Sequence, residues 1–330
     1  MKKLKLLLST AICLVIFQNC KKEKTYPDPT PYSMEVPSYF PILDIPEENP
    51  MTVEGIALGR RLYYDPIMDK NGVNSCSSCH NTASAFTTAS SNSLAHINLA
   101  WGKYFLWNGK VEGSLEDIMQ FEVDVFFQTD LSKLEASEEL KDMFGAAFGS
   151  NLISSENAAK ALAQFARLLT SKDSKYDKAI TPQSWVYLND SEQRGYDIFF
   201  SEKGDCFHCH GGPLFTDGLF HNNGLDSSPS SGREGITKNN LDQGKYKTPT
   251  LRNVELTMPY MHDGRFQTLE EVIEFYSTGL KSSTTVDPLM KNVERGGLQL
   301  NSQEKSDLLN FLKTLTDTTF TNNPALSNPL

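Results

Sequence analysis

The sequence predicts a mainly α-helical protein whose two halves share one plan and carry long irregular loops. Apolar residues recur at helical spacing in 156–169 and in 301–315. No segment alternates apolar and polar residues over the length of a strand. The pattern Gly-x-x-aliphatic-aromatic-aromatic occurs at 59–64 and again at 195–200, which indicates an internal duplication rather than two unrelated amphipathic helices.

Helix boundaries follow from capping residues. Ser155 can cap a helix over Glu156–Leu169. Asn301 and Glu304 resemble the capping box of a second helix. The stretch Asn222–Lys247 is rich in Gly, Ser and Asn, and we expect a long loop there. Loops of this length are usually functional.

Composition and charge exclude several classes of protein. The chain has 330 residues, of which 39% are hydrophobic and 22% charged, as in globular proteins of about two domains. The formal charge is −10, and residues 1–24 hold six lysines against one glutamate, so the remainder is more acidic still. Such a surface repels nucleic acid and attracts basic protein partners.

The N-terminus predicts export. Three lysines precede a short apolar run, which is too short to span a bilayer, so we expect a signal peptide at 1–19. Cys20 ends the run and resembles the lipidated cysteine of a lipoprotein. Residues 20–40 would then be lipid anchor and tether. The alternatives are a plain secretory signal and an uncleaved anchor.

Four of the six cysteines fall in two C-x-x-C-H motifs. The motif residues are Cys76, Cys79, His80, Cys206, Cys209 and His210. Residues i and i+3 share one helical face, so both thiols of a motif can bond to the vinyl groups of one porphyrin, and the adjoining histidine can bind its iron. A zinc ribbon does not require these histidines, a redox dithiol needs a βαβ context, and adjacent cysteines make poor disulfide staples.

The motifs therefore predict two covalently bound c-type haems with His80 and His210 as iron ligands. The fold class becomes mainly α, with two cytochrome c-like haem domains and long irregular loops. We place the N-terminal domain at 41–180 and the C-terminal domain at 181–330. The two aromatic pairs near 64 and 200 are expected to pack on the porphyrins.

The chain resembles the bacterial di-haem cytochrome c peroxidases from about residue 50 to residue 317. Besides both haem motifs, the resemblance is carried by segments 58–66, 105–109, 114–116, 212–217, 247–254 and 257–264. It implies that the N-terminal haem is peroxidatic and that the C-terminal haem collects electrons. It also implies a role for Trp107 between the haems, and a calcium site formed by Asn92 with the carbonyls of Thr257 and Pro259.

The distal ligand of the second haem departs from the peroxidase pattern. The family usually has methionine there, and counting from Thr268 places Tyr276 at that position. A tyrosine ligand resembles the di-haem relatives that mature methylamine dehydrogenase by oxidising its tryptophans. The rival ligands are Met258, Met261 and Met290, and Tyr276 could also be a buried structural residue.

The first pocket departs as well. Aligned from Ser114, Gln128 stands where the family has a proton-shuttling glutamate, and an amide orients peroxide without exchanging a proton. Glu122 or Asp124 could supply that proton from a nearby turn. His96 lies in a packed segment, so we expect the first haem to lack a second protein ligand.

These observations favour a peroxidase that reduces hydrogen peroxide to water with electrons from a cytochrome c-like donor. We expect a periplasmic or outer-membrane-associated lipoprotein, and the resemblance implies a homodimer. The alternatives are a peroxide-dependent oxidase that modifies a partner protein, motivated by Tyr276, and a two-haem electron relay without catalysis.

Overall fold

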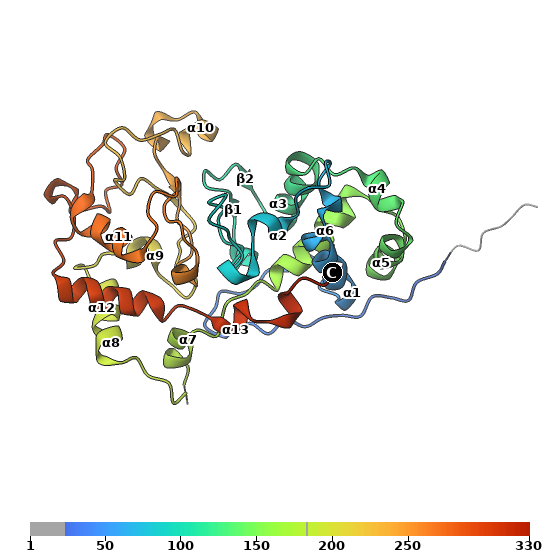
Figure 1. Ribbon diagram of the computed structural model, residues 1–330, viewed down its shortest axis with the longest axis horizontal. Coiled ribbons are helices and arrows are strands. Elements are labelled where there is room, and N and C mark those ends of the chain that lie inside the picture. The colour runs from blue at the N-terminus through green and yellow to red at the C-terminus, as the bar shows by residue number, and fades with distance from the viewer. Residues whose placement is uncertain (1–23, 183) are drawn as a thin grey trace, which may run out of the picture.

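The computed structural model describes residues 24–182 and 184–330 of the chain. Most of its regular structure is helical, and the helices gather into two groups that Figure 1 shows side by side. This confirms the predicted mainly α fold. The domain boundaries at 180 and 181 stay a prediction.

The helices are short and joined by long loops. In the first group they are α1 Val53–Tyr64, α2 Cys76–Cys79, α3 Leu115–Phe121, α4 Leu131–Glu135, α5 Glu138–Phe148 and α6 Ser155–Arg167. The others are α7 Lys175–Ile180, α8 Asp190–Phe199, α9 Phe207–His210, α10 Glu234–Thr237, α11 Leu269–Glu274, α12 Ser302–Lys313 and α13 Thr318–Thr321. Two antiparallel pairs complete the described part: β1 Tyr104–Phe105 with β2 Val111–Glu112, and β3 Phe220–His221 with β4 Tyr246–Lys247.

Each group of helices has its own hydrophobic core. The first core is centred on α1 and α6, and the second on α8 and α12. The C-terminal segment crosses between them, because Phe320 and Leu326 are buried in the first core. Arg60 of α1 secures this crossing by donating from Nε to the carbonyl of Ser327 at 2.7 Å.

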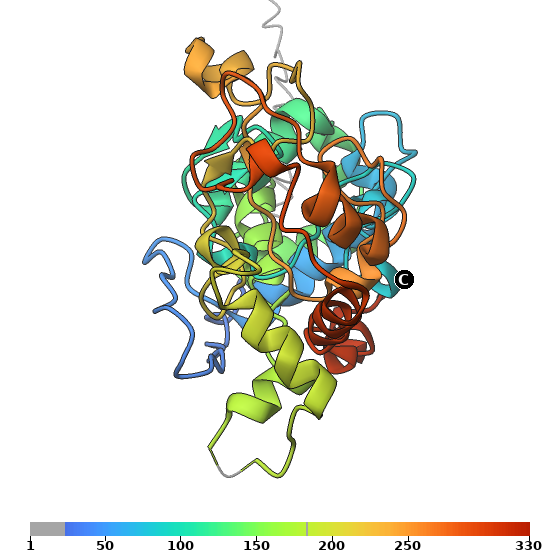
Figure 2. The same ribbon diagram turned by 90° about the vertical axis from the view of Figure 1, so that its left-hand side faces the viewer.

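The two cores repeat one helix crossing. A Cβ on Gly59 of α1 would lie 1.9 Å from the carbonyl oxygen of Ala161 in α6. A Cβ on Gly195 of α8 would lie 2.0 Å from the carbonyl oxygen of Asp307 in α12. Only glycine permits so close an approach, which explains the repeated glycine of the sequence pattern. Figure 2 shows α8 against α12.

The aromatic residues of the repeated pattern pack mostly within the cores. Tyr63 and Tyr64 contact the first core, and Phe200 packs beside the second. Of the four aromatics, Phe199 alone lines the cavity between the haem motifs. The expectation that both pairs pack on the porphyrins was therefore wrong for the other three, because α1 and α8 turn them towards α6 and α12.

Most of the predicted helix starts are accurate to one residue. The α6 helix is capped by Ser154, whose hydroxyl accepts from Asn157 N, and not by Ser155. The Asn301–Glu304 capping box of α12 is confirmed. Capping boxes also start α3, at Ser114, and α11.

Both α3 and α11 end in a π-helical turn. These turns span Glu122–Phe126 and Phe275–Gly279. A π-helical turn widens the helix by one residue and is frequent at functional sites. It also shifts the direction of every later side chain.

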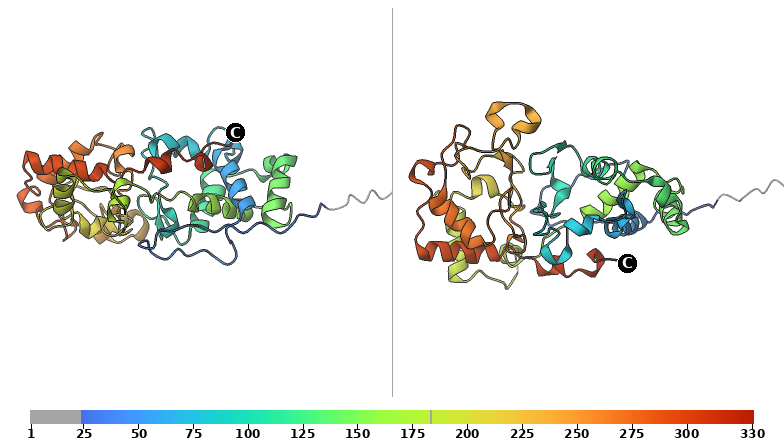
Figure 3. Two further views of the ribbon diagram at one scale, coloured as in Figure 1. Left: turned by 90° about the horizontal axis from the view of Figure 1, so that it is seen from below. Right: turned by 45° about the horizontal axis from the view of Figure 1, so that its top comes forward.

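The N-terminal segment runs along both groups of helices (Figure 3). Tyr32 N donates to Met51 O near α1, and the Tyr39 hydroxyl donates to Asp177 of α7. The predicted signal peptide and Cys20 lie outside the described residues. Within 24–182 and 184–330, no helix has the length and apolarity needed to cross a membrane.

Candidate active site

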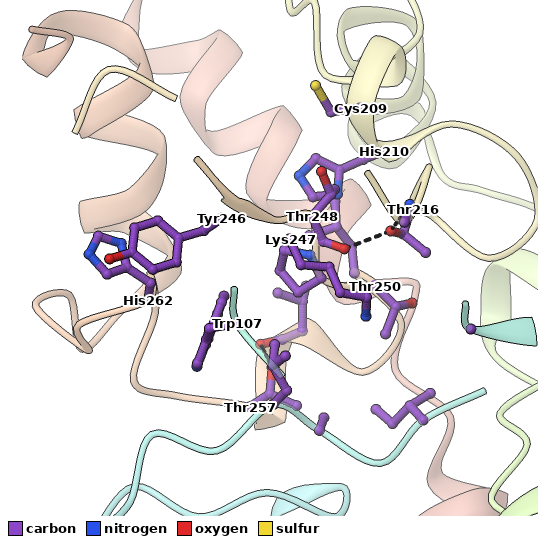
Figure 4. Close-up of a pocket in the computed structure, with 18 of the residues that line it drawn as sticks. Trp107, Cys209, His210, Thr216, Tyr246, Lys247, Thr248, Thr250, Thr257 and His262 are labelled. Atoms are coloured by element: carbon purple, nitrogen blue, oxygen red, sulfur yellow. Dashed lines mark hydrogen bonds between the residues drawn. The ribbon is translucent and has the colours of Figure 1, made fainter. Parts of the chain in front are cut away.

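A cavity of about 1380 Å³ lies between the two groups of helices and is lined by both C-x-x-C-H motifs. Its wall includes Trp107, Glu122, Lys247 and Tyr276. Figure 4 shows the side of the second motif, where His210, Lys247 and Trp107 surround one hollow. Residues from both halves thus meet in a single space.

The motif cysteines are unpaired, as haem attachment requires. Cys76, Cys79, Cys206 and Cys209 are all free thiols. The short helices α2 and α9 hold each pair one turn apart, on one face. Disulfides within these motifs are therefore excluded as the explanation of their spacing.

Both motif histidines are oriented alike. His80 Nδ1 donates to the carbonyl of Phe86 at 3.0 Å, and His210 Nδ1 donates to the carbonyl of Phe215 at 3.2 Å. Both phenylalanines have positive φ, 60° and 52°, which turns these carbonyls towards the histidines. With Nδ1 protonated and bonded, Nε2 is free to bind iron in each half.

Lys247 adds a positive charge to the cavity wall. Burial lowers the pKa of its amine to about 8. Among residues 24–182 and 184–330, no hydrogen bond or ion pair from its amine is recorded. A buried amine without an acidic partner fits a haem propionate, and together with the free thiols it makes this cavity suitable for two c-type haems.

Glu122 is the acidic residue on the side of the first motif. It begins the π-helical turn after α3 and lines the cavity. Burial raises the pKa of its carboxyl to about 7, and no side-chain partner is recorded for it within the described chain. Burial and this nearby carboxylate also raise the pKa of the Cys76 thiol.

Gln128 does not reach the cavity. It is exposed, has φ of 48° and accepts a weak hydrogen bond from Lys70 at 3.4 Å. Asp124 is also exposed, and its carboxylate accepts from Gln120 at 2.6 Å. The structure thus brings Glu122, and neither of the other two candidates, to the first haem motif.

Tyr276 lies near the second motif, in the π-helical turn after α11. It lines the cavity, its hydroxyl accepts from Asn223 Nδ2 at 3.0 Å, and burial raises its pKa to about 12. Met261 and Met290 line the cavity too. Met258 is 42% exposed and is not among the lining residues.

Trp107 stands where the two halves meet. Its indole Nε1 donates to Asn92 O at 3.1 Å, and its own carbonyl accepts from Lys247 N at 2.8 Å. The Asn92 amide faces the second half, where it donates to the carbonyls of Met261 and His262. Thr257 and Pro259 line the same cavity.

The two candidate distal residues occupy equivalent positions. Glu122 and Tyr276 each stand eight residues after the capping residue of their helix, Ser114 or Thr268. Aligning the two halves on these capping boxes would have identified Glu122 from sequence. Lys247 had no comparable signal, because a lysine in a loop is usually solvated.

Comparison with known proteins agrees with this site. A family model described as di-haem cytochrome c peroxidase matches residues 53–184. The methylamine utilization protein MauG of Methylorubrum extorquens is 31% identical over 292 residues, which cover 82% of this chain and 80% of MauG. The cytochrome c551 peroxidase of Nitrosomonas europaea is 30% identical, with 84% of each chain covered.

A solved structure is similar over nearly the whole chain. It is titled a MauG-like protein associated with microbial copper homeostasis, and it has a TM-score of 0.81 and 31% identity. The match covers 90% of this chain and 99% of that one.

The fold and these matches define an oxidoreductase with two c-type haems. The chain belongs to the di-haem cytochrome c peroxidase family, which includes MauG.

Proposed function

We propose that this protein reduces hydrogen peroxide to water in the first half of the cavity, using electrons from a small cytochrome c-like donor. The observation that carries the proposal is Glu122, a carboxyl group with a pKa of about 7 beside the first haem motif. Such a group can take up and return a proton at neutral pH. A pure electron relay has no use for it.

The haem iron supplies the redox chemistry of the O–O bond when it is bound, and the protein supplies the proton. The Glu122 carboxylate takes a proton from the near oxygen of hydrogen peroxide. It returns this proton to the far oxygen, which leaves as water. His80, held through Nδ1 by Phe86, presents Nε2 from the opposite direction.

Trp107 and Tyr276 complete the proposed site. The Trp107 indole lies between the motifs, where it can carry an electron from one half to the other. Tyr276 is proposed as the protein ligand of the second haem. Its position matches that of Glu122 in the first half, which favours it over Met261 and Met290. An iron ion offsets the cost of a buried phenolate.

A second candidate function is the oxidation of a partner protein. Tyr276 favours it, since a phenolate ligand stabilises ferric iron whereas a thioether favours the ferrous state. Two relatives are methylamine utilization proteins named MauG. On this hypothesis, peroxide-oxidised protein without donor keeps its altered absorbance for minutes, and Tyr276→Met shortens that time. Rapid return in the unsubstituted protein counts against it.

The test of the leading proposal is a pH profile of peroxide turnover. The holoprotein is mixed with reduced cytochrome and hydrogen peroxide between pH 5 and 9. Because the carboxylate form of Glu122 accepts the first proton, kcat/KM rises with pH through about 7. Two cytochromes are oxidised for each peroxide. No turnover with any reduced cytochrome contradicts the proposal.

A matched pair of variants assigns the effect. Glu122→Gln loses about 100-fold or more in kcat/KM and its profile becomes flat. Asp124→Asn removes an exposed carboxyl two residues away and keeps both the rate and the profile. Equal losses in both variants contradict the role of Glu122.

The remaining predictions concern the surroundings of the site. We propose an exported, lipid-anchored protein that forms homodimers, with calcium held by Asn92 and the carbonyls of Thr257 and Pro259. Asn92 reaches the second half directly. A cation there would join the halves further, so chelation is expected to lower the melting temperature of the holoprotein.

A further inference from the structure

We propose that His96 and Tyr63 are positioning residues for the proximal histidine of the first haem, and that they distinguish this haem from the second. The proposal rests on His80 being the iron ligand of the first haem. It does not depend on which reaction the iron performs. Three contacts carry it.

The first contact is a stack of two imidazoles. The rings of His80 and His96 have centroids 3.4 Å apart and planes inclined by 16°. The second contact is a shared carbonyl: Phe86 O accepts from His80 Nδ1 at 3.0 Å and from His96 N, also at 3.0 Å. Since one backbone oxygen holds both residues, the stack is fixed from the main chain as well as from the rings.

The third contact holds His96 from its other side. The hydroxyl of Tyr63 lies 3.1 Å from His96 Nδ1, within hydrogen-bond distance. Tyr63 is fully buried and packs edge-on against Phe86 and Phe165. A buried hydroxyl without a partner is costly, so this bond defines the rotation of the His96 ring. The ring in turn leaves His80 one orientation about its Cβ–Cγ bond.

The second half has the same scaffold without the polar pair. There, Phe215 O accepts from His210 Nδ1 and from Leu251 N, so Leu251 occupies the position of His96. Phe199 stands four residues after Gly195, as Tyr63 stands four after the first repeated glycine. A leucine and a phenylalanine are therefore sufficient to build this crossing, and the polar pair serves something other than folding.

The stack also settles which side of the cavity His96 occupies. It lies alongside His80, so it approaches from the proximal side and does not compete with Glu122 for the distal position. Groups that contact an iron-binding histidine set its orientation and basicity, and their loss typically costs about 10–100-fold in activity or affinity. The same effect is expected here for one haem of the two.

The test is the electron paramagnetic resonance spectrum of the ferric holoprotein, which needs no peroxide. His96→Leu gives the first half the residue of the second half and is expected to change the signal of the first haem while leaving that of the second unchanged. Tyr63→Phe, which leaves the stack in place, gives a smaller change of the same kind. Leu251→Ala, the matched control, leaves the first-haem signal unchanged.

A double variant separates positioning from packing. Because Tyr63 acts through His96, the variant with both Tyr63→Phe and His96→Leu has the spectrum of His96→Leu alone. Where peroxide is turned over, kcat/KM falls by about tenfold in both. An unchanged first-haem signal in His96→Leu with full haem content overturns the proposal, as do additive effects. A protein without peroxide turnover leaves the spectral comparison decisive.

Discussion

The two haem pockets are built on one scaffold and differ at the residues that face the iron. In both, a histidine is held by the carbonyl of a phenylalanine with positive φ, and a helix that begins with a capping box ends in a π-helical turn. The residue presented by that turn is Glu122 in one pocket and Tyr276 in the other. The comparison indicates that one position decides between an iron open to substrate and an iron closed by the protein.

The difference is one of chemistry as well as of size. Glu122 has no recorded partner in the described chain, and its carboxyl titrates near neutral pH. The Tyr276 hydroxyl is held by Asn223 and stays protonated until about pH 12 unless a metal is present. A free acid suits proton transfer, and a fixed phenol suits ligation.

Making the first pocket resemble the second is expected to have the largest effect. Glu122→Tyr places a phenol where peroxide should bind and removes the proton carrier. We expect peroxide turnover to fall by at least about 100-fold and the first haem to become low-spin, as judged by electron paramagnetic resonance. A variant that keeps its activity would break the comparison.

The two halves are also expected to differ in stability. Burial alone would raise the pKa of Asp177, but two hydrogen bonds and the charge of Arg252 lower it. Asp177→Asn should reduce the free energy of unfolding by about 3–5 kcal/mol in urea titrations, because it leaves a buried guanidinium without its counter-charge.

The sign of the pH dependence follows from the same pair. The folded-state pKa of Asp177 is depressed, so its contribution is present above the unfolded value of about 4 and is lost as the pH falls through the folded one. In the first half, Glu116 pairs with one nitrogen of Arg167, whose other two lack partners in the described chain. Glu116→Gln is therefore expected to cost less, and an equal cost would contradict this difference.

Exchanging the ligand of the second haem should shift its reduction potential. With Tyr276→Met, a thioether replaces the phenolate and the midpoint potential should rise by on the order of 0.1 V in spectroelectrochemical titration. Met290→Leu changes a rival ligand in the same cavity and should leave the potential in place. The opposite pattern would assign the second iron to Met290.

The smallest expected effect concerns the donor. The chain carries a formal charge of −10, so a basic cytochrome should be attracted to it. Its KM should rise about threefold between low and physiological ionic strength, while that of an uncharged donor stays constant. A KM that is insensitive to salt would indicate an apolar docking surface instead.

Much of the fold was predictable because local signals carry it. Capping boxes and helical periodicity identified α6 and α12 to within one or two residues, and the repeated glycines identified the helix crossings. The aromatic residues after those glycines were misplaced, because a sequence does not show which way a helix turns within its core.

The candidate site was predictable where spacing alone determines the chemistry. Two C-x-x-C-H motifs suffice for haem attachment, and counting from Thr268 led to Tyr276. Counting on to Gln128 failed, because α3 passes into a π-helical turn and the chain then leaves the helix with φ of 48° at Gln128. The stack of His96 on His80 depends on a loop conformation that no periodicity encodes.

The central claim is that the first haem is open on the side of Glu122 and the second is closed by Tyr276. It is tested most directly by the electron paramagnetic resonance spectrum of the ferric holoprotein as isolated. The account predicts one high-spin and one low-spin signal, with Tyr276→Met altering only the low-spin one. Two low-spin signals, or a high-spin signal that responds to Tyr276→Met, would contradict it.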